Sequence, residues 1–274
     1  MNSPLITSLQ NQRVKDAAKL RDRRQREKQG RFLIDGVREL DRALDAGLLP
    51  ADVFICSDLC ASDEARRLFA RVTQLAPQAV SEVTAEVFEK LAFGERLEGI
   101  VASVPTPIKP LAALQLPDDA IVCVLENVEK PGNLGAILRS ADAAGVAAVI
   151  AADDQTDLFN PNAVRASLGT IFSMPTAVAD AATTLSWLRE RHFSMWAARV
   201  GSGPTYTDVD YRGPTAIILG SEADGLSARF WADDIRPIHL PMLGRADSLN
   251  VSVAAAIMFY EALRQRAIPS EPRT

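Results

Sequence analysis

The sequence predicts an α/β protein with two domains, of which the second has a mostly parallel sheet covered by helices on both faces. Strands and helices alternate along residues 121–266, as they do in parallel sheets. Residues 121–125 are all apolar, which is typical of a strand buried on both faces. The length of 274 residues suits about two domains. Four prolines between residues 105 and 117 mark a linker between them.

The elements before the linker follow from local apolar patterns bounded by turn and cap residues. A very polar helix comes first, and strands then alternate with helices, one of which ends at Gly47. The helices expected here cover residues 14–28, 37–46, 63–75 and 85–91, and the strands cover 31–34, 52–56, 79–83 and 100–104.

After the linker the alternation is clearer, and Gly145 marks the end of the first helix. The strands expected here cover residues 121–125, 146–151, 194–198, 215–219 and 235–240, and the helices cover 134–144, 160–168, 183–191 and 249–266. We therefore predict a first domain at residues 1–104, a Pro-rich linker at 105–118 and a second domain at 119–274.

Composition argues against several classes of protein. Apolar residues make up 47% and charged residues 24% of the chain, as in ordinary globular proteins. No apolar run reaches the ~18 residues of a membrane helix, and the first twenty residues lack the apolar core of a signal peptide. We therefore expect a cytoplasmic protein with no membrane partner.

The cysteines and histidines are too few and too scattered for a disulfide framework or a zinc site. Cys56 and Cys60 lie four residues apart, but neither His192 nor His239 is near them, and Cys123 stands alone. We expect no bound metal and structural roles for both histidines, so catalysis by metal or histidine is disfavoured.

The net charge of −5 conceals a basic segment. Residues 13–31 hold nine Lys or Arg against three Asp or Glu, a net charge of +6, so the rest of the chain carries −11. A basic segment on an acidic protein indicates local contact with a polyanion. The alternative is a solvated helix face.

The first of three polar segments covers residues 126–142, where a strand ends and a helix begins. Ligands of α/β sheets usually bind at such places, but this segment is neither a dinucleotide fingerprint nor a phosphate-binding P-loop. Asn133 is either a helix cap or a ligand-binding residue. Arg139 is either a surface ion pair or a side chain that reaches a ligand at the helix start.

The other two segments follow later strands. In residues 217–226, Glu222 and Asp224 are candidate acid–base carboxylates, although turn solvation explains Asp224 better. In residues 238–256, a strand leads through a loop into a helix that is apolar on several faces, which indicates burial in the core or against a second subunit. Ser248 can be explained as a helix cap, and Asn250 less readily so.

In this order and spacing, the three segments resemble the SpoU (TrmH) class of the SPOUT RNA methyltransferases. The matching residues are Asn133 and Arg139 after a strand, then Leu219-Gly220-Ser221-Glu222 with Gly225, then Leu240-Pro241-Met242 followed by Ser248-Leu249-Asn250. The likeness covers residues 120–266. Glu126 and Glu129-Lys130 stand where relatives more often have Asp-x-x-x-Asp-Pro.

The first half resembles the substrate-binding domain that many members of this class carry, an α/β/α domain related to a ribosomal RNA-binding protein. Phe32-Leu33-Ile34-Asp35-Gly36 matches the place where that domain usually reads Phe-Leu-x-Glu-Gly, with Asp in place of Glu.

The resemblance implies an α/β knot domain, with a deep trefoil knot and a parallel sheet, that methylates a ribose 2′-hydroxyl of RNA with S-adenosylmethionine. It also implies a homodimer with the active site near the interface. The cofactor residues it implies are Gly220, Leu240 and Leu249, and the catalytic residues are Asn133, Arg139, Glu222, Ser248 and Asn250. The basic segment would grip RNA phosphates through Arg13, Lys15, Arg21, Arg23, Arg24, Arg26, Lys28 and Arg31.

Two questions stay open at this point. The resemblance assigns removal of the hydroxyl proton to Arg139, but a guanidinium normally stays protonated; the alternative is that Arg139 binds the phosphate and stabilises the alkoxide. The separate first domain favours large-subunit ribosomal RNA as substrate. The alternatives are a transfer RNA methyltransferase, a non-catalytic RNA-binding protein of the same fold, and a nucleotide-cofactor enzyme such as a dehydrogenase.

Overall fold

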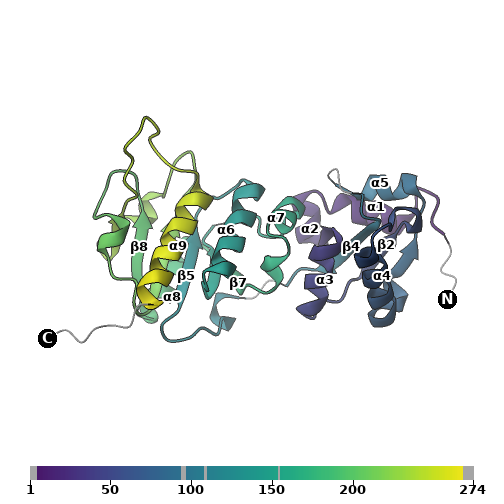
Figure 1. Ribbon diagram of the computed structural model, residues 1–274, viewed down its shortest axis with the longest axis horizontal. Helices are drawn as coiled ribbons and strands as arrows, with labels where there is room; N and C mark the ends of the chain where they lie inside the picture. Colours follow the sequence, from purple (N-terminus) through teal and green to yellow (C-terminus); the bar gives the residue numbers. More distant parts are fainter. Residues whose placement is uncertain (1–4, 94–96, 108–109, 154, 268–274) are drawn as a thin grey trace. The chain divides into compact units, whose positions relative to one another are not determined.

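A computed structural model describes residues 5–93, 97–107, 110–153 and 155–267 (Figure 1). The chain forms two compact units. The first comprises Met1–Pro107 with Phe159–Ser173, and the second comprises Ile108–Leu158 with Met174–Thr274. The first unit thus includes a segment from the later half of the chain, which the sequence-based division at residues 104 and 119 did not foresee.

The first unit is a mixed four-stranded sheet with helices. In the strand order β1-β4-β2-β3, β4 is antiparallel to both of its neighbours and β3 is parallel to β2. Its helices are α1 (Gln12–Lys19), α2 (Arg23–Gln29), α3 (Val37–Asp45), α4 (Asp63–Leu75), α5 (Ala85–Leu91) and α7 (Pro161–Ala166), and its strands are β1 (Arg31–Asp35), β2 (Asp52–Ile55), β3 (Val80–Glu82) and β4 (Ile100–Pro105).

Segment 159–173 packs on β1 through aromatic rings. The ring of Phe32 lies 5.0 Å from that of Phe159 and 5.8 Å from that of Phe172, measured between centroids. Phe32 is fully buried and Phe159 nearly so. Because burial of aromatic side chains contributes a large share of core stability, this segment is part of the first unit's core.

The single helix expected at residues 14–28 is wrong, because the chain forms two helices there. Asp22 begins α2 by accepting a hydrogen bond from a backbone N–H in the first turn of that helix. The buried Arg26 side chain donates to the carbonyl oxygens of Leu20 and Arg21, at 2.8 Å each, where α1 ends. The run around Asp22 is polar throughout, so its periodicity does not change where the first helix ends. The periodicity therefore gave no sign of the break.

The second unit is a six-stranded sheet in which all neighbours are parallel, in the order β10-β8-β9-β5-β6-β7. Its strands are β5 (Ile121–Leu125), β6 (Ala148–Ala151), β7 (Thr176–Val178), β8 (Ser194–Ala198), β9 (Thr215–Leu219) and β10 (Ile235–Ile238), and its helices are α6 (Pro131–Ala143), α8 (Ala181–Glu190) and α9 (Val251–Ala267).

Helices cover both faces of this sheet. Val122 and Val124 of β5 share a core with Leu185 and Leu188 of α8 on one face. Helices α6 and α9 lie side by side on the other face, where α6 contacts β6 and α9 contacts β9 (Figure 1). Since both faces are covered, β5 and β6 are apolar throughout, and β8 and β9 are apolar after their first residue.

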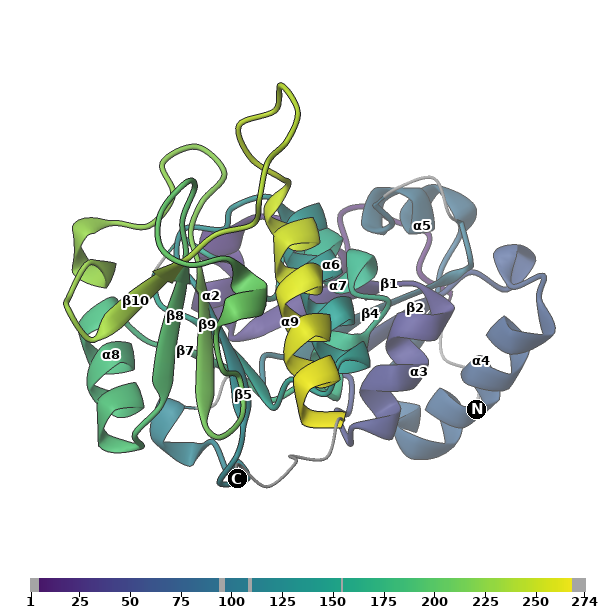
Figure 2. The same cartoon turned by 60° about the vertical axis from the view of Figure 1, so that its left-hand side comes forward.

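The strand order places a ligand-binding edge at the carboxyl ends of β5 and β9. The chain proceeds from β5 to β6 and β7 on one side, and β8, β9 and β10 lie on the other side. Ligands of open α/β sheets bind outside the carboxyl ends of the strands where the order reverses in this way. The loops that follow β8, β9 and β10 gather at that edge (Figure 2).

Most expected elements have nearly the observed bounds. The edge strand β7, only three residues long, was not expected. Helix α9 begins at Val251 rather than Leu249, because Asn250 caps it: Asn250 Oδ1 accepts a hydrogen bond of 2.9 Å from the backbone N–H of Ser252. Within the described part of the chain, no helix is long and apolar enough to cross a membrane.

Candidate functional site

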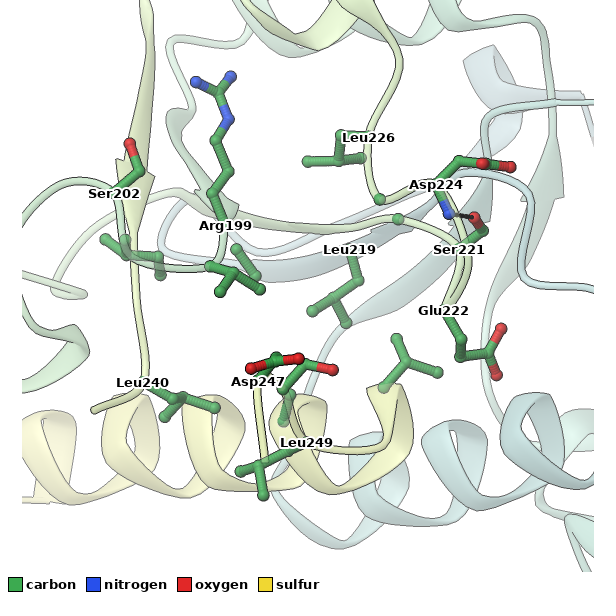
Figure 3. A pocket seen from close by; sticks show the side chains of 18 of the residues that line it. Arg199, Ser202, Leu219, Ser221, Glu222, Asp224, Leu226, Leu240, Asp247 and Leu249 are labelled. Carbon is green, nitrogen blue, oxygen red and sulfur yellow. Dashed lines mark hydrogen bonds between the residues drawn. The ribbon is translucent and has the colours of Figure 1, made fainter. Parts of the chain in front are cut away.

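A pocket of about 480 Å³ opens at the carboxyl edge of the second unit's sheet (Figure 3). Its volume lies within the range of about 300 to 1,000 Å³ that is typical of small-molecule sites. Its walls come from the ends of β8, β9 and β10, from the loops after them and from the first turns of α9. The apolar lining includes Leu219, Leu226, Leu240, Leu249 and Met258, and the polar lining includes Arg199, Ser202, Glu222, Asp224 and Asp247.

All three residues expected to bind the cofactor, Gly220, Leu240 and Leu249, line this pocket. Gly220 follows β9 directly, and a Cβ atom there would overlap the backbone of Gly225. The chain can turn back this tightly because Ser221 and Gly225 exchange backbone hydrogen bonds of 3.1 Å in both directions. The turn therefore requires glycine at position 220 and exposes peptide groups to the pocket.

Three of the expected catalytic side chains form one hydrogen-bonded network. Asn250 Nδ2 donates to Asn133 Oδ1 at 3.0 Å, and Asn133 Nδ2 donates to Glu222 Oε1. The three residues come from the start of α9, the first turn of α6 and the loop after β9. Because Glu222 also lines the pocket, the network lies at the pocket's rim.

The structure decides between the interpretations of the two asparagines. Asn133 is not a helix cap, because α6 begins at Pro131 after Lys130 and the Asn133 side chain bonds to Glu222 and Asn250 instead. Asn250 has a double role, since its Oδ1 caps α9 while its Nδ2 reaches Asn133. Ser248, the other candidate cap, is exposed and lines the pocket.

Arg139 is not part of this network. It lies on α6, six residues and ~9 Å along the helix axis from Asn133, and its side chain is exposed. The alternative of a surface ion pair finds no support, because none of the salt bridges between described residues includes Arg139. Its guanidinium is thus available to an anion from outside this monomer.

Two features near the pocket were missed by sequence reasoning. Glu126 is buried at the end of β5 and accepts hydrogen bonds from the backbone N–H and the hydroxyl of Ser227, at 2.7 and 2.6 Å. This contact fixes the loop after β9 to β5. Arg199 and Trp231 also line the pocket, with the guanidinium carbon 4.4 Å from the indole centroid. The position of Glu126, an acid directly after a buried strand, is a sequence signal that could have revealed its contact with Ser227. No local sequence signal pairs Arg199 with Trp231.

The basic residues expected to bind RNA divide into two groups in the first unit. The group held by other protein atoms consists of Arg13 and Arg31 (both paired with Asp52), Arg21 (bonded to the Ala92 carbonyl), Arg23 (paired with Glu27) and the buried Arg26. The other group, for which no ion pair or hydrogen bond is found within the described ranges, consists of Lys15, Arg24 and Lys28. Arg26 has little surface to offer to RNA, and Arg24 and Lys28 are exposed.

The described residues contain no cluster of three or more His, Cys, Asp or Glu side chains that could hold a metal ion. His239 Nδ1 lies 3.0 and 3.1 Å from the carbonyl oxygens of Gly203 and Pro204. The backbone N–H of His239 donates to Pro204 as well. These contacts join the end of β10 to the loop after β8, a structural role.

Family models match both halves of the chain. Residues 120–260 match the SpoU rRNA methylase family, and residues 11–102 match the MRM3-like substrate binding domain. This protein belongs to the SpoU rRNA methylase family. The family and fold class predicted from the sequence are therefore confirmed, including the substrate-binding domain before the methylase domain.

Whole-length relatives agree with this assignment. The chain is 30% identical to the 23S rRNA (guanosine(2553)-2′-O)-methyltransferase RlmP of Bacillus subtilis, over 93% of this chain and 97% of that one. A solved RNA 2′-O ribose methyltransferase superposes with a TM-score of 0.83 at 38% identity, covering 97% of this chain and all of that chain. An AdoMet-bound rRNA methyltransferase from Sinorhizobium meliloti superposes with a TM-score of 0.86 at 29% identity, covering 95% and 97%.

Proposed function

We propose that this SpoU family member transfers the methyl group of S-adenosylmethionine to a ribose 2′-hydroxyl of large-subunit ribosomal RNA. The observation that carries the proposal is the Asn133–Glu222–Asn250 network at the rim of a pocket of cofactor size. The relatives support ribosomal RNA over transfer RNA, since RlmP acts on 23S rRNA and matches this chain over nearly its full length.

The volume and the lining of the pocket suit S-adenosylmethionine. At Gly220 there is no room for a Cβ atom, so the peptide groups of the turn can contact the cofactor directly. Leu240 and Leu249 offer apolar surface for the adenine ring of the cofactor. The carboxylates of Asp224 and Asp247 offer partners for the cofactor's positive sulfonium and amino groups. When bound, this cofactor supplies a methyl group that its sulfonium charge has already activated.

The residues of the chain then orient the reacting ribose. Holding a hydroxyl in line with a fixed electrophile can lower the barrier of such a reaction by up to about 7–11 kcal/mol. The hydrogen bonds of Asn133 to Glu222 and Asn250 fix both amides, and Ser248, two residues before Asn250, lines the pocket. These groups thus hold the ribose in a fixed position relative to the cofactor.

Arg139 binds the RNA phosphate next to the target ribose and stabilises the developing alkoxide. The phosphate or a water molecule takes the hydroxyl proton, because a guanidinium is a poor base. The exposed position of Arg139, without an ion-pair partner among the described residues, supports a role toward an anion that arrives with the substrate.

The enzyme acts as a homodimer in the cytoplasm, where it meets ribosomal RNA. Helix α9 exposes Val253, Tyr260 and Leu263, which share one face at helical spacing. A row of large exposed apolar side chains on one helix is typical of an interface. Helix α6, which bears Arg139, packs beside α9, so a second copy on this face would stand close to Arg139.

The test is transfer of labelled methyl from S-adenosylmethionine to purified ribosomal RNA, to transfer RNA and to large ribosomal subunits. The expected result is label in large-subunit ribosomal RNA. Label only in transfer RNA would overturn the substrate, and absence of cofactor binding would favour the non-catalytic RNA-binding protein.

A further inference from the structure

All three tryptophans lie in the described part of the chain, and each has an arginine guanidinium over its ring. Two of the rings are core groups, since Trp187 and Trp196 are each 5% exposed. Trp231 differs, because it is 62% exposed although Arg199 covers its ring from one side. A tryptophan is usually well buried, so the exposure of this ring needs an explanation.

The exposed ring is fixed in place. Trp231 Nε1 donates a 3.2 Å hydrogen bond to the Leu226 carbonyl, and the Arg199 guanidinium stacks on the ring at 4.4 Å. Arg199 in turn donates to the carbonyl oxygen of Phe230, whose side chain is fully buried. A ring held by its polar edge and by one face loses little conformational entropy when a ligand stacks on its free face.

The ring lines the pocket on the side opposite two of the expected cofactor residues, Leu240 and Leu249. Trp231 and Arg199 both line the pocket. Figure 3 shows Arg199 and Leu226, the two residues that hold the ring, across the pocket from Leu240 and Leu249. Because the indole contacts both Arg199 and Leu226, it belongs to that side of the pocket, and its exposed face is open to a substrate larger than the cofactor.

We propose that Trp231 is a stacking platform for an unpaired nucleobase of the substrate RNA, close to the ribose that is methylated. This inference rests on the proposed function. Proteins that bind single-stranded RNA stack splayed bases on exposed aromatic rings, and a paired base would have no free face. The substrate is accordingly a single-stranded loop or bulge rather than a continuous duplex.

Local charge favours stacking over a phosphate contact as the source of affinity here. Arg199 is engaged with the ring and the Phe230 carbonyl, and Asp224 and Asp247 line the same pocket. Carboxylates repel a phosphate but not the face of a base. The cation behind the indole also orders the ring through a cation–π contact.

The test compares Trp231→Ala and Trp231→Phe with the wild-type enzyme, all as full-length chains. The substrate is a 23S ribosomal RNA transcript, and the readouts are KM for RNA and kcat in methyl transfer, Kd for RNA by filter binding, and Kd for S-adenosylmethionine by calorimetry. Trp231→Ala is expected to raise KM and Kd for RNA about 5- to 150-fold, which corresponds to loss of one base–aromatic stack of about 1–3 kcal/mol. Trp231→Phe keeps a ring and is expected to stay close to wild type.

The matched control is Leu75→Ala, which removes another exposed large apolar side chain, at the end of α4 and outside the pocket lining. It is expected to leave all four readouts unchanged. A stack releases no counterions, so the slope of RNA affinity against salt is expected to be equal in Trp231→Ala and wild type.

Three outcomes would overturn the inference. If wild type methylates the RNA and Trp231→Ala binds the RNA as tightly as wild type does, the stacking platform is refuted and the proposed function stands. A raised Kd for S-adenosylmethionine with unchanged RNA affinity would assign Trp231 to the cofactor wall instead. If wild type transfers no methyl group, the proposed function fails, and equal RNA binding by wild type and Trp231→Ala would then refute the platform as well.

Discussion

Asn250 Nδ2 lies 3.0 Å from Asn133 Oδ1 and donates a hydrogen bond to it, which joins the start of α9 to the first turn of α6 across 117 residues of sequence. Asn133 continues the chain of bonds to Glu222 through its Nδ2. Each amide donates to one neighbour and accepts from another. Loss of either the donor or the acceptor of Asn133 therefore separates the segments that carry Glu222 and Asn250.

The variant Asn133→Asp tests this connection. Aspartate has the shape of asparagine but no donor for Glu222, and it places a second carboxylate against the first, where like charges repel. We expect kcat/KM for methyl transfer to fall about 100-fold through misplacement of the reacting groups. The exposed Asn162 on α7 is the control position, and full activity of Asn133→Asp beside an unchanged Asn162→Asp would refute the network's role.

The turn after β9 makes a second prediction. Gly220→Ala puts a Cβ atom into the backbone of Gly225, so the turn must open and the pocket wall must shift. We expect the affinity for S-adenosylmethionine, measured by calorimetry, to fall at least tenfold, which corresponds to about 1.4 kcal/mol of binding free energy. Gly244→Ala, at a position with open space around it, should bind normally; equal binding by both variants would contradict this account.

Asp35 predicts a pH-dependent stability of the first unit. Burial, together with the carboxylates of Glu98 and Glu39, raises its pKa to about 6, although the Phe93 N–H and the Arg165 guanidinium act in the opposite direction. The folded state therefore favours the protonated form of Asp35. The stability that this preference adds is fully present below about pH 4 and is lost as the pH rises through about 6.

The measurement is urea unfolding of wild type and Asp35→Asn between about pH 4 and pH 7. The variant has no titrating group at this site. As the pH rises, the free energy of unfolding of wild type should therefore fall relative to that of Asp35→Asn. Asp58→Asn, at an exposed position of the same unit, should follow wild type. Parallel profiles for wild type and Asp35→Asn would show that Asp35 titrates normally.

The basic segment predicts a salt-dependent contact with RNA. Arg24 and Lys28 are exposed and unpaired in the described structure, so the double variant Arg24→Ala/Lys28→Ala should weaken RNA binding. The slope of log affinity against log salt should fall by about 1 for each phosphate that the variant no longer binds. Arg67→Ala, an exposed arginine on α4, is the control. An unchanged slope in the double variant would exclude these side chains as phosphate ligands.

Sequence patterns predicted most of the elements well because these elements depend on local signals. Strand β5 is apolar throughout, and Asn133, Glu222 and Asn250 follow strands or begin helices in a recognisable spacing. Their mutual hydrogen bonds follow once the sheet order brings those segments to one edge.

Other features depend on contacts between distant residues, which no local pattern reports. The segment around Phe159 joins the first unit because its ring packs on Phe32, and Arg199 meets Trp231 only in the folded chain. The break in the polar helix depends on one capping side chain, Asp22, within a run whose periodicity is uniform.

The most direct test of the central claim is to map the methylated position. Ribosomal RNA labelled with the wild-type enzyme is cleaved with alkali, which spares the bond next to a 2′-O-methylated ribose. We predict label at one alkali-resistant site with wild type, and loss of that label in Arg139→Ala with cofactor binding retained. Label on a base, in fragments that alkali cleaves normally, or full activity of Arg139→Ala would contradict the account.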